Sequence, residues 1–379
     1  MMHTAGIYLH IPFCIKKCAY CDFYSITDLT KRPPFVAALL KEIYLRREPK
    51  VICDSVYLGG GTPSLLNPKA IDKLFSTLRG SFSIADQSEI TIEANPATLC
   101  LAKLVTLRQI GVNRINIGIQ SFTEKHLSFL GRSHTAEEAH KSLADARKAG
   151  FTNVGLDLIY GLPEQTENTW QQDLEIALSY TPEHISCYML SYEPDTFLDN
   201  QRRYGKITPL SETKVAHLFE FTSGYLTSHG YNHYEISNFA RKDPHKDLRS
   251  RHNRKYWNFS PYYGFGPAAH SYSTGKRTWN VRNVVDYIKT LSQKQLPMAE
   301  SETLSLTQQR LEAIYLGLRQ SSGIDLTVFK KKFGEDLVSA NQSLLKKLRK
   351  EKMVICNGET LALTVKGMRF MDSIVPLLT

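Results

Sequence analysis

The sequence lacks a long hydrophobic run, an export signal and internal repeats. Its 379 residues are 42% hydrophobic. No apolar stretch approaches the roughly 20 residues that a membrane-spanning helix needs. The opening segment MMHTAGIYLHIPF has no basic start followed by a long apolar stretch, as a secretion signal would have. These absences predict a cytoplasmic protein without a transmembrane segment, and they leave peripheral contact with a membrane open.

Cysteine is scarce outside one short segment. Cys14, Cys18 and Cys21 follow the spacing C-x3-C-x2-C, and the other four of the seven cysteines are scattered singly. The odd total and the absence of an export signal argue against disulfides. Three thiolates can hold a metal centre but cannot saturate it, because cubane clusters and structural zinc both normally take four protein ligands. The spacing alone leaves two alternatives, an iron–sulfur cluster with one open position or a zinc site completed by His10.

Strand and helix patterns alternate through the first half of the chain. The strand candidates are residues 6–12, 54–61, 89–96, 113–120, 153–162 and 184–190. Helical patterns lie between them at residues 35–45, 71–78, 99–109, 136–149 and 169–178. This rhythm predicts an α/β fold with a parallel sheet, either doubly wound or closed as an incomplete barrel.

The second half has a different pattern. One helix is expected at residues 211–229, followed by a loop-rich, basic and aromatic stretch to about residue 272. Helical patterns at 306–319 and 326–350, the second broken at Gly334, precede two short strands around an Asn-Gly turn. We predict three segments. They are residues 1–210, a connecting segment 211–300, and a mainly helical, winged-helix-like module at 301–379.

The charge balance is basic, with 47 lysines and arginines against 37 acidic residues. The net charge of +10 suits a polyanionic partner, either a nucleic acid or a small molecule such as a nucleotide or a carboxylated tetrapyrrole. The lysines at 330–332 and 346–352 fit a solvated helix face better than a nucleic-acid surface. We therefore expect no nucleic-acid partner.

Chemically distinctive residues lie in or directly after the predicted strands. In chain order they are the cysteines, Gly59-Gly60-Gly61-Thr62-Pro63, Glu93, Gln120 and Asp157. The carboxyl ends of parallel strands meet at one rim, where ligands bind. Glycines at such a rim let the backbone approach a ligand and expose N–H donors. Glu93 and Asp157 could accept hydrogen bonds from a ribose or an amine, or form salt bridges with Arg114 or Arg132.

Together these motifs resemble the radical S-adenosylmethionine (SAM) superfamily. CIKKCAYC, with Tyr20 before the last cysteine, matches the signature of that superfamily. GGGTP, IEANP, NRINIGIQSF and DLIYGLP are similar to a narrower group, the oxygen-independent coproporphyrinogen III oxidases and their relatives. The resemblance implies a partial (β/α)6 TIM-like barrel. It also implies a 4Fe–4S cluster on Cys14, Cys18 and Cys21 whose fourth iron binds SAM, and an electron donor for that cluster. The residues implied to bind SAM are Tyr8, Gly60, Gly61, Thr62, Glu93, Gln120, Arg132 and Asp157.

Two departures separate the chain from the oxidases. Their signature continues to a further cysteine where this chain has Phe23, and they carry an amino-terminal extension where only seven residues precede Tyr8. Residues 252–257, HNRKYW, match instead a motif of a sister branch, the HemW-type heme chaperones. That resemblance implies a protein that binds heme and hands it to an acceptor protein. It leaves open whether the chain is an enzyme, with oxidation of coproporphyrinogen as the alternative function.

The same resemblance implies a heme site on the HNRKYW motif. The implied residues are His252, Asn253, Arg254, Tyr256 and Trp257. Histidine is a standard axial ligand of heme iron. Arginine could pair with the propionates, and the two aromatic rings could pack on the macrocycle. The alternative is a surface loop whose aromatic side chains anchor it to the barrel.

Overall fold

The computed structural model describes residues 4–378, and its main sheet has twelve strands. Six strands in its centre are parallel and follow one another in chain order. They are β1 (Ala5–Ile11), β2 (Glu48–Gly60), β3 (Phe82–Ala94), β4 (Arg114–Gln120), β5 (Val154–Tyr160) and β6 (His184–Met189). The predicted series of six parallel strands is therefore confirmed, with β2 and β3 starting earlier than expected.

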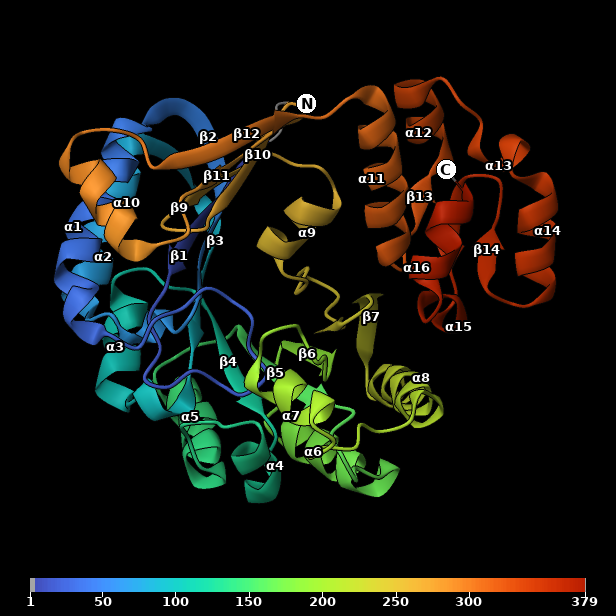
Figure 1. Ribbon diagram of the computed structural model, residues 1–379, viewed down its shortest axis with the longest axis horizontal. Helices are drawn as coiled ribbons and strands as arrows, with labels where there is room; N and C mark the ends of the chain where they lie inside the picture. The colour runs from blue at the N-terminus through green and yellow to red at the C-terminus, as the bar shows by residue number, and fades with distance from the viewer. Residues whose placement is uncertain (1–3, 379) are drawn as a thin grey trace.

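Helices connect these strands and flank the sheet. They are α1 (Arg32–Leu45), α2 (Pro68–Ser81), α3 (Leu101–Gln109), α4 (Glu124–Phe129), α5 (Ala136–Lys148) and α6 (Glu167–Ser179). Their starts are set by local capping. The Asn67 side chain accepts a hydrogen bond from the N–H of Ala70, the third residue of α2, and Thr135 forms a capping box with Glu138 in α5. Figure 1 shows α1 and α2 on the left of the sheet, with α5 and α6 below it.

Side chains on the central strands alternate between an apolar face and a polar face, because successive residues of a strand point in opposite directions. Ile7 and Leu9 of β1 are fully buried in the main hydrophobic core. Tyr8 faces the other way, and the strand register sets it beside Tyr57 of β2. We call this second, polar face the lumen of the partial barrel. It carries the residues at which function is expected.

Six short strands and four helices lie between residues 194 and 304. The helix expected at residues 211–229 is confirmed, whereas the following stretch to about residue 272 is not loop-rich as expected, because it holds four of the strands and one of the helices. The strands are β7 (Tyr231–Glu235), β8 (Asn238–Arg241), β9 (Tyr262–Phe265), β10 (His270–Ser273), β11 (Lys276–Asn280) and β12 (Met298–Thr303). The helices are α7 (Phe197–Arg203), α8 (Glu212–Ser228), α9 (Arg251–Trp257) and α10 (Val284–Ser292). β8 and β7 extend the β6 edge, whereas β9 to β12 extend the β1 edge. These strands are only four to six residues long, too short for a period-two pattern to stand out.

The last part of the chain forms a compact module with its own hydrophobic core, drawn in orange and red at the right of Figure 1. α11 (Leu306–Arg319) has the limits that the sequence predicts, and the helical pattern after it breaks at Gly334 as expected. The other helices are α12 (Leu326–Phe333), α13 (Leu337–Ala340), α14 (Gln342–Lys350), α15 (Val365–Met368) and α16 (Met371–Ile374). The strands β13 (Ile324–Asp325), β14 (Val354–Cys356) and β15 (Thr360–Leu363) form a separate three-stranded sheet. The limits of the three predicted segments stay a prediction.

Across residues 4–378, no helix combines the length and the apolar character that crossing a bilayer requires.

Candidate functional site

The three clustered cysteines lie on one loop directly beyond the carboxyl end of β1. All three thiols are free and partly exposed. Thr62 Oγ1 donates a hydrogen bond to Cys14 Sγ at 3.6 Å, and Arg132 Nη1 donates to Cys18 Sγ at 3.3 Å. Burial raises the pKa of Cys21 to about 11, and the neighbouring thiols add to that effect. A metal centre would be needed to hold this thiol as a thiolate near neutral pH.

The donor set of this loop fits a cluster better than a zinc ion. The zinc alternative needs His10, but its Nε2 is 2.9 Å from the Tyr24 carbonyl oxygen and its Nδ1 is 3.2 Å from the Tyr8 hydroxyl. Within residues 4–378, no three His, Cys, Asp or Glu side chains converge on one ion position. A cubane distributes its thiolates over separate irons. Three free thiols with two polar donors beside them suit that arrangement.

The glycine loop after β2 packs against the start of the cysteine loop. Gly61 N–H donates to the Ile11 carbonyl at 2.9 Å. A Cβ added at Gly61 would lie 2.7 Å from the Phe13 carbonyl oxygen, next to Cys14. Gly60 has a φ of +112°, a conformation that glycine adopts at little cost. The two glycines therefore let the chain segments of β1 and β2 meet where the cysteines begin.

The Gly61→Ala variant is expected to displace the Phe13–Cys14 backbone, lower the free energy of unfolding by about 1–3 kcal/mol and reduce cluster retention. Iron per chain after anaerobic reconstitution and a urea unfolding curve measure both effects. Gly80→Ala is the matched control. A Cβ at this position in α2 has no neighbour within 4 Å, so that variant should be neutral or stabilised by up to about 1 kcal/mol. Equal iron retention in the two variants would contradict this account of the loop.

Glu93 occupies the lumen between β2 and β4. Tyr57 Oη donates to its Oε1 at 2.7 Å, and the Gly60 N–H donates to its Oε2 at 3.2 Å. Burial and, to a smaller extent, the Asp157 carboxylate raise the pKa of Glu93, the hydrogen bonds from Tyr57 and Gly60 partly offset this, and the net pKa is about 7. About half of the Glu93 side chains are therefore ionised at neutral pH. A cationic or hydroxyl-bearing ligand would stabilise the ionised form and increase its share.

Gln120 lies on β4 and Asp157 on β5, the next two strands of the sheet after β3. Asn116 Nδ2 donates to Asp157 Oδ2 at 2.7 Å, and burial raises the pKa of Asp157. Asp157, Glu93 and Asn116 border a small polar cavity of about 40 Å³ in the lumen. Gln120 has a φ of +68°, and its amide lies beside Gly118, whose carbonyl oxygen accepts from Arg132 Nη2 at 2.7 Å.

The salt bridges that the sequence left as an alternative for these carboxylates are not formed within the described chain. Arg114 pairs with Glu89 at 3.7 Å, not with Glu93 or Asp157. Arg132 contacts Cys18 and Gly118 instead. Both lumen carboxylates are therefore held by neutral donors, which leaves their charge available to a ligand.

The HNRKYW motif is not a surface loop but helix α9, which closes the barrel at the amino-terminal end of β1. His252 is buried, its Nδ1 is 3.0 Å from Ser55 Oγ and its Nε2 is 3.0 Å from the Tyr256 hydroxyl. Its ring stacks on Tyr57 at a centroid distance of 5.2 Å. Burial, and then the charge of Lys255, lower the pKa of His252 to about 3, so the ring is neutral.

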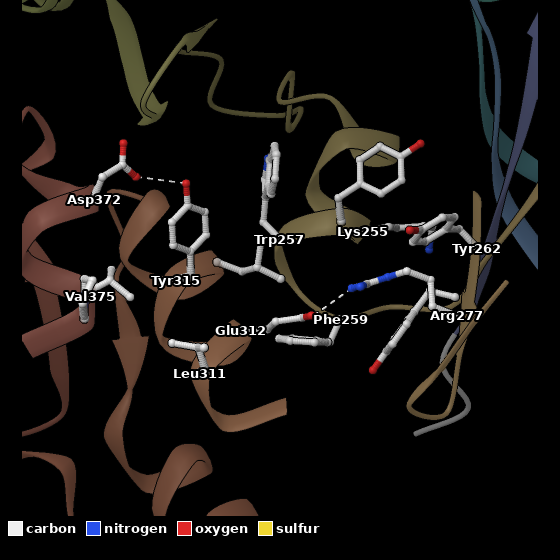
Figure 2. A pocket seen from close by; sticks show the side chains of 14 residues that line it. Lys255, Trp257, Phe259, Tyr262, Arg277, Leu311, Glu312, Tyr315, Asp372 and Val375 are labelled. Atoms are coloured by element: carbon white, nitrogen blue, oxygen red, sulfur yellow. Dashed lines mark hydrogen bonds and ion pairs between the residues drawn. The ribbon is translucent and has the colours of Figure 1, made fainter. Parts of the chain in front are cut away.

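This arrangement departs from the heme contacts expected of the motif. Both ring nitrogens of His252 are engaged, so neither is available as an iron ligand in this conformation. Arg254 pairs with Asp247 at 2.9 Å, which occupies the guanidinium expected at a propionate. Asn253 borders the lumen cavity. Of the five residues expected at heme, Tyr256 and Trp257 border a larger hollow, together with Lys255 of the same motif (Figure 2).

Sequence reasoning missed three residues whose side chains fix the predicted site residues by hydrogen bonds. Tyr57 orients Glu93, Ser55 holds His252, and Asn116 holds Asp157. Tyr57 lies in the apolar run before the glycines, and its lumen position follows from the period-two alternation of β2. That alternation was the signal by which these residues could have been found.

Comparisons with known proteins agree with this architecture. Residues 8–177 match the family described as the radical SAM superfamily, and residues 304–370 match the HemN C-terminal domain. The fold is similar to that of coproporphyrinogen III oxidase (HemN) from Escherichia coli. The TM-score is 0.85 at 24% identity, covering 99% of this chain and 90% of that chain. The chain thus has the radical SAM fold, followed by a HemN-type C-terminal module.

Sequence relatives define the family more narrowly. The heme chaperone HemW of Bacillus subtilis is 35% identical to this chain and covers 93% of it, over 93% of its own length. HemW of Lactococcus lactis is 34% identical over 95% of this chain and 93% of its own length. HemW of Escherichia coli is 36% identical over 75% of this chain and 73% of its own length. This chain belongs to the HemW family, as the motifs predict.

Proposed function

We propose that this protein is a heme chaperone that binds heme and transfers it to an acceptor protein, on a scaffold that also holds a 4Fe–4S cluster and SAM. The observation that carries the proposal is the near full-length similarity to proteins named heme chaperone HemW. The HNRKYW motif and the hollow beside its last two residues support it.

In this proposal Cys14, Cys18 and Cys21 each hold one iron of the cluster. Thr62 and Arg132 stabilise the anionic sulfurs by donating hydrogen bonds to them. When bound, the cluster and SAM supply one-electron reductive chemistry, for which a low-potential donor protein is the implied partner. We propose the cytoplasm as the compartment, where thiols stay reduced.

The SAM site would lie on the rim and the upper lumen. The residues proposed to contact SAM are Tyr8, Gly60, Gly61, Thr62, Glu93, Gln120, Arg132 and Asp157. Glu93 would accept hydrogen bonds from the ribose or the amino group, and Tyr57 would keep its carboxylate turned toward the rim. The exposed N–H groups of the glycine loop would bind the carboxylate end.

The oxidase alternative has less in its favour. The likeness to the Escherichia coli enzyme, at 24% identity, concerns the fold. Phe23, with 65% of its surface exposed, stands where the oxidases have a further cysteine. We expect no protoporphyrinogen from anaerobic incubation of the cluster-loaded protein with SAM, a reductant and coproporphyrinogen.

The chaperone function is tested by loading and transfer. The anaerobically reconstituted protein is expected to bind hemin with a Soret shift and, after removal of free hemin, to pass it to apomyoglobin. Iron, sulfide and heme are quantified on the same preparation. A protein without a Soret shift, or one that keeps its heme in the presence of excess apomyoglobin, would contradict the proposal. Formation of protoporphyrinogen would favour the oxidase.

A further inference from the structure

A groove of about 840 Å³ lies between the amino-terminal parts of α1 and α2, two helices that lie side by side at the left of Figure 1. Two short 3-10 helices, Leu29–Lys31 and Pro63–Leu65, precede α1 and α2 and complete its walls. Arg32 Nη1 donates to the Leu65 carbonyl oxygen at 2.9 Å, which joins the two walls. The groove is distinct from the lumen cavity and from the hollow beside α9, because it shares no bordering residue with either.

This groove lies next to the cysteine loop, because both of its walls continue from segments that contact Cys14. The Cys14 N–H donates to the Ile26 carbonyl oxygen at 3.0 Å, and Ile26 lies three positions before Leu29. Thr62, whose hydroxyl donates to Cys14 Sγ, directly precedes Pro63–Leu65. A molecule bound in the groove is therefore close to the proposed cluster ligands.

The floor of the groove is apolar. Its large side chains pack against the main core but are only partly buried, and they are Leu29, Val36, Leu40 and Leu65. Ala37 borders the same groove and is exposed. Apolar side chains gathered at one accessible place are typical of a surface that another molecule covers.

The edge of the groove is positively charged. Lys69 and Lys73 lie one turn apart on α2, are exposed and form no ion pair within residues 4–378. Arg32 donates to the carbonyl oxygens of Leu29 and Leu65, so its charge is not balanced by a carboxylate there. Of the residues that the structure describes, no aspartate or glutamate borders the groove. The positive ends of the α1 and α2 dipoles add to this charge.

The cysteine loop carries further positive charge. Lys16 and Lys17 are exposed, and neither forms an ion pair in the described part of the chain. The nearby carboxylates are Asp22, which is exposed, and Asp28, which pairs with Lys31 at 3.1 Å. Acidic side chains therefore offset only part of the basic charge, and a negatively charged partner would be attracted to the loop and to the groove.

We propose that an acidic electron-carrier protein of low reduction potential docks on this groove and reduces the cluster. This inference rests on the proposed function, which includes the cluster, and assigns the docking surface of its electron donor. One electron passes from the reduced carrier to the cluster, and the carrier is oxidised by one electron, so no other reactant is needed. Electron-carrier complexes are small, with less than about 1,200 Å² buried, so one groove beside the cysteine loop is enough for such a contact. Opposite charges provide the fast association that a brief contact needs.

Charge reversal on α2 tests the electrostatic part of the contact. Fully reduced flavodoxin serves as the carrier, and its anaerobic oxidation by the cluster-loaded protein is followed by stopped-flow absorption. The double variant Lys69→Glu/Lys73→Glu should lower the second-order rate constant at least about tenfold at low ionic strength and weaken its dependence on salt.

The matched control is Lys346→Glu/Lys350→Glu. These exposed lysines also lie one turn apart, on α14 and outside the groove, so the variant has the same change of net charge. Its rate constant should stay within about threefold of the wild-type value. Equal losses in the two double variants would show an effect of net charge alone and would overturn the docking surface.

A second variant fills the groove without changing its charge. Ala37→Trp places a large ring over the apolar floor, and Ala340→Trp makes the same change at an exposed alanine of α13 that does not border the groove. Ala37→Trp should lower the rate constant at least about fivefold and keep the salt dependence of the wild type, whereas Ala340→Trp should have little effect. An unchanged rate in Ala37→Trp would overturn the groove as the docking site.

Reduction by dithionite separates this inference from the proposed function. Dithionite is small and needs no docking surface, so it should reduce the cluster of every variant to the same extent as in the wild type. A wild-type cluster that dithionite reduces, but that neither flavodoxin nor a 2Fe–2S ferredoxin reduces, would overturn the docking inference and leave the cluster in place. A wild-type protein that assembles no cluster would remove the proposed function itself.

Discussion

Replacing Cys14, Cys18 or Cys21 singly by alanine is expected to abolish cluster assembly, lowering iron and sulfide from about four per chain to a few tenths. Each thiol is the sole protein ligand proposed for its iron, and the loop offers no substitute, because both ring nitrogens of His10 are engaged. The loss is measured by iron and sulfide analysis and by the visible absorption of the cluster after anaerobic reconstitution.

The matched control for this experiment is Cys100→Ala. Cys100 is also free and is exposed, but it lies before α3, away from the cysteine loop. Its removal should leave iron and sulfide unchanged, and circular dichroism should show that all variants are folded. A triplet variant that keeps a full complement of sulfide, or a wild type that binds zinc without sulfide, would contradict the cluster assignment.

Glu93→Gln is expected to stabilise the SAM-free protein above pH 7 and to weaken SAM binding. The pKa of Glu93 is raised from 4.5 to about 7 in the folded protein, so the folded state retains a proton that the unfolded state loses. The free energy of unfolding therefore falls as the pH rises from about 4.5 to 7, by up to roughly 3 kcal/mol, and stays low at higher pH. Glutamine removes this cost because it cannot ionise.

Two measurements separate the effect of Glu93→Gln on stability from its effect on SAM affinity. Urea unfolding of Glu93→Gln at pH 5 and at pH 8 should show the missing pH dependence, and equilibrium binding to the cluster-loaded protein should show SAM affinity about tenfold lower. Asp86→Asn, at an exposed carboxyl group on the same strand, is the control and should change neither quantity. Unchanged SAM affinity in Glu93→Gln would remove Glu93 from the proposed SAM site.

Much of the fold could be predicted from the sequence because its signals are local. The six parallel strands alternate with helices in a pattern that short windows detect, and the limits of α11 were predicted to the residue. The strands β7 to β12 could not be predicted in the same way. Each is four to six residues long and is defined by its partner strand, such as β9 beside β1 some 250 positions earlier, and not by its own periodicity.

The candidate site likewise has a part that local sequence patterns predict and a part that depends on distant residues. The cysteine spacing is a local pattern, and the strand ends that carry Gly60 and Glu93 follow from the topology of a parallel sheet. The partners of His252 were beyond reach, since Ser55 lies 197 positions earlier in the chain. The sequence favoured a heme ligand at His252, with a residue of a surface loop as the alternative, and neither interpretation predicts that the ring is buried. Burial against Tyr57 and Tyr8 is a property of the assembled barrel.

The hollow beside α9 is bounded by two bodies that have separate hydrophobic cores. Ion pairs such as Glu235–Arg319 and Arg277–Glu312 join them, at 2.8 Å each. The width of the space thus depends on how the two bodies are docked as well as on the residues that face it. Substitution of Glu235 or Arg319, which do not border the hollow, is therefore expected to alter its width while every residue of the cysteine loop stays the same.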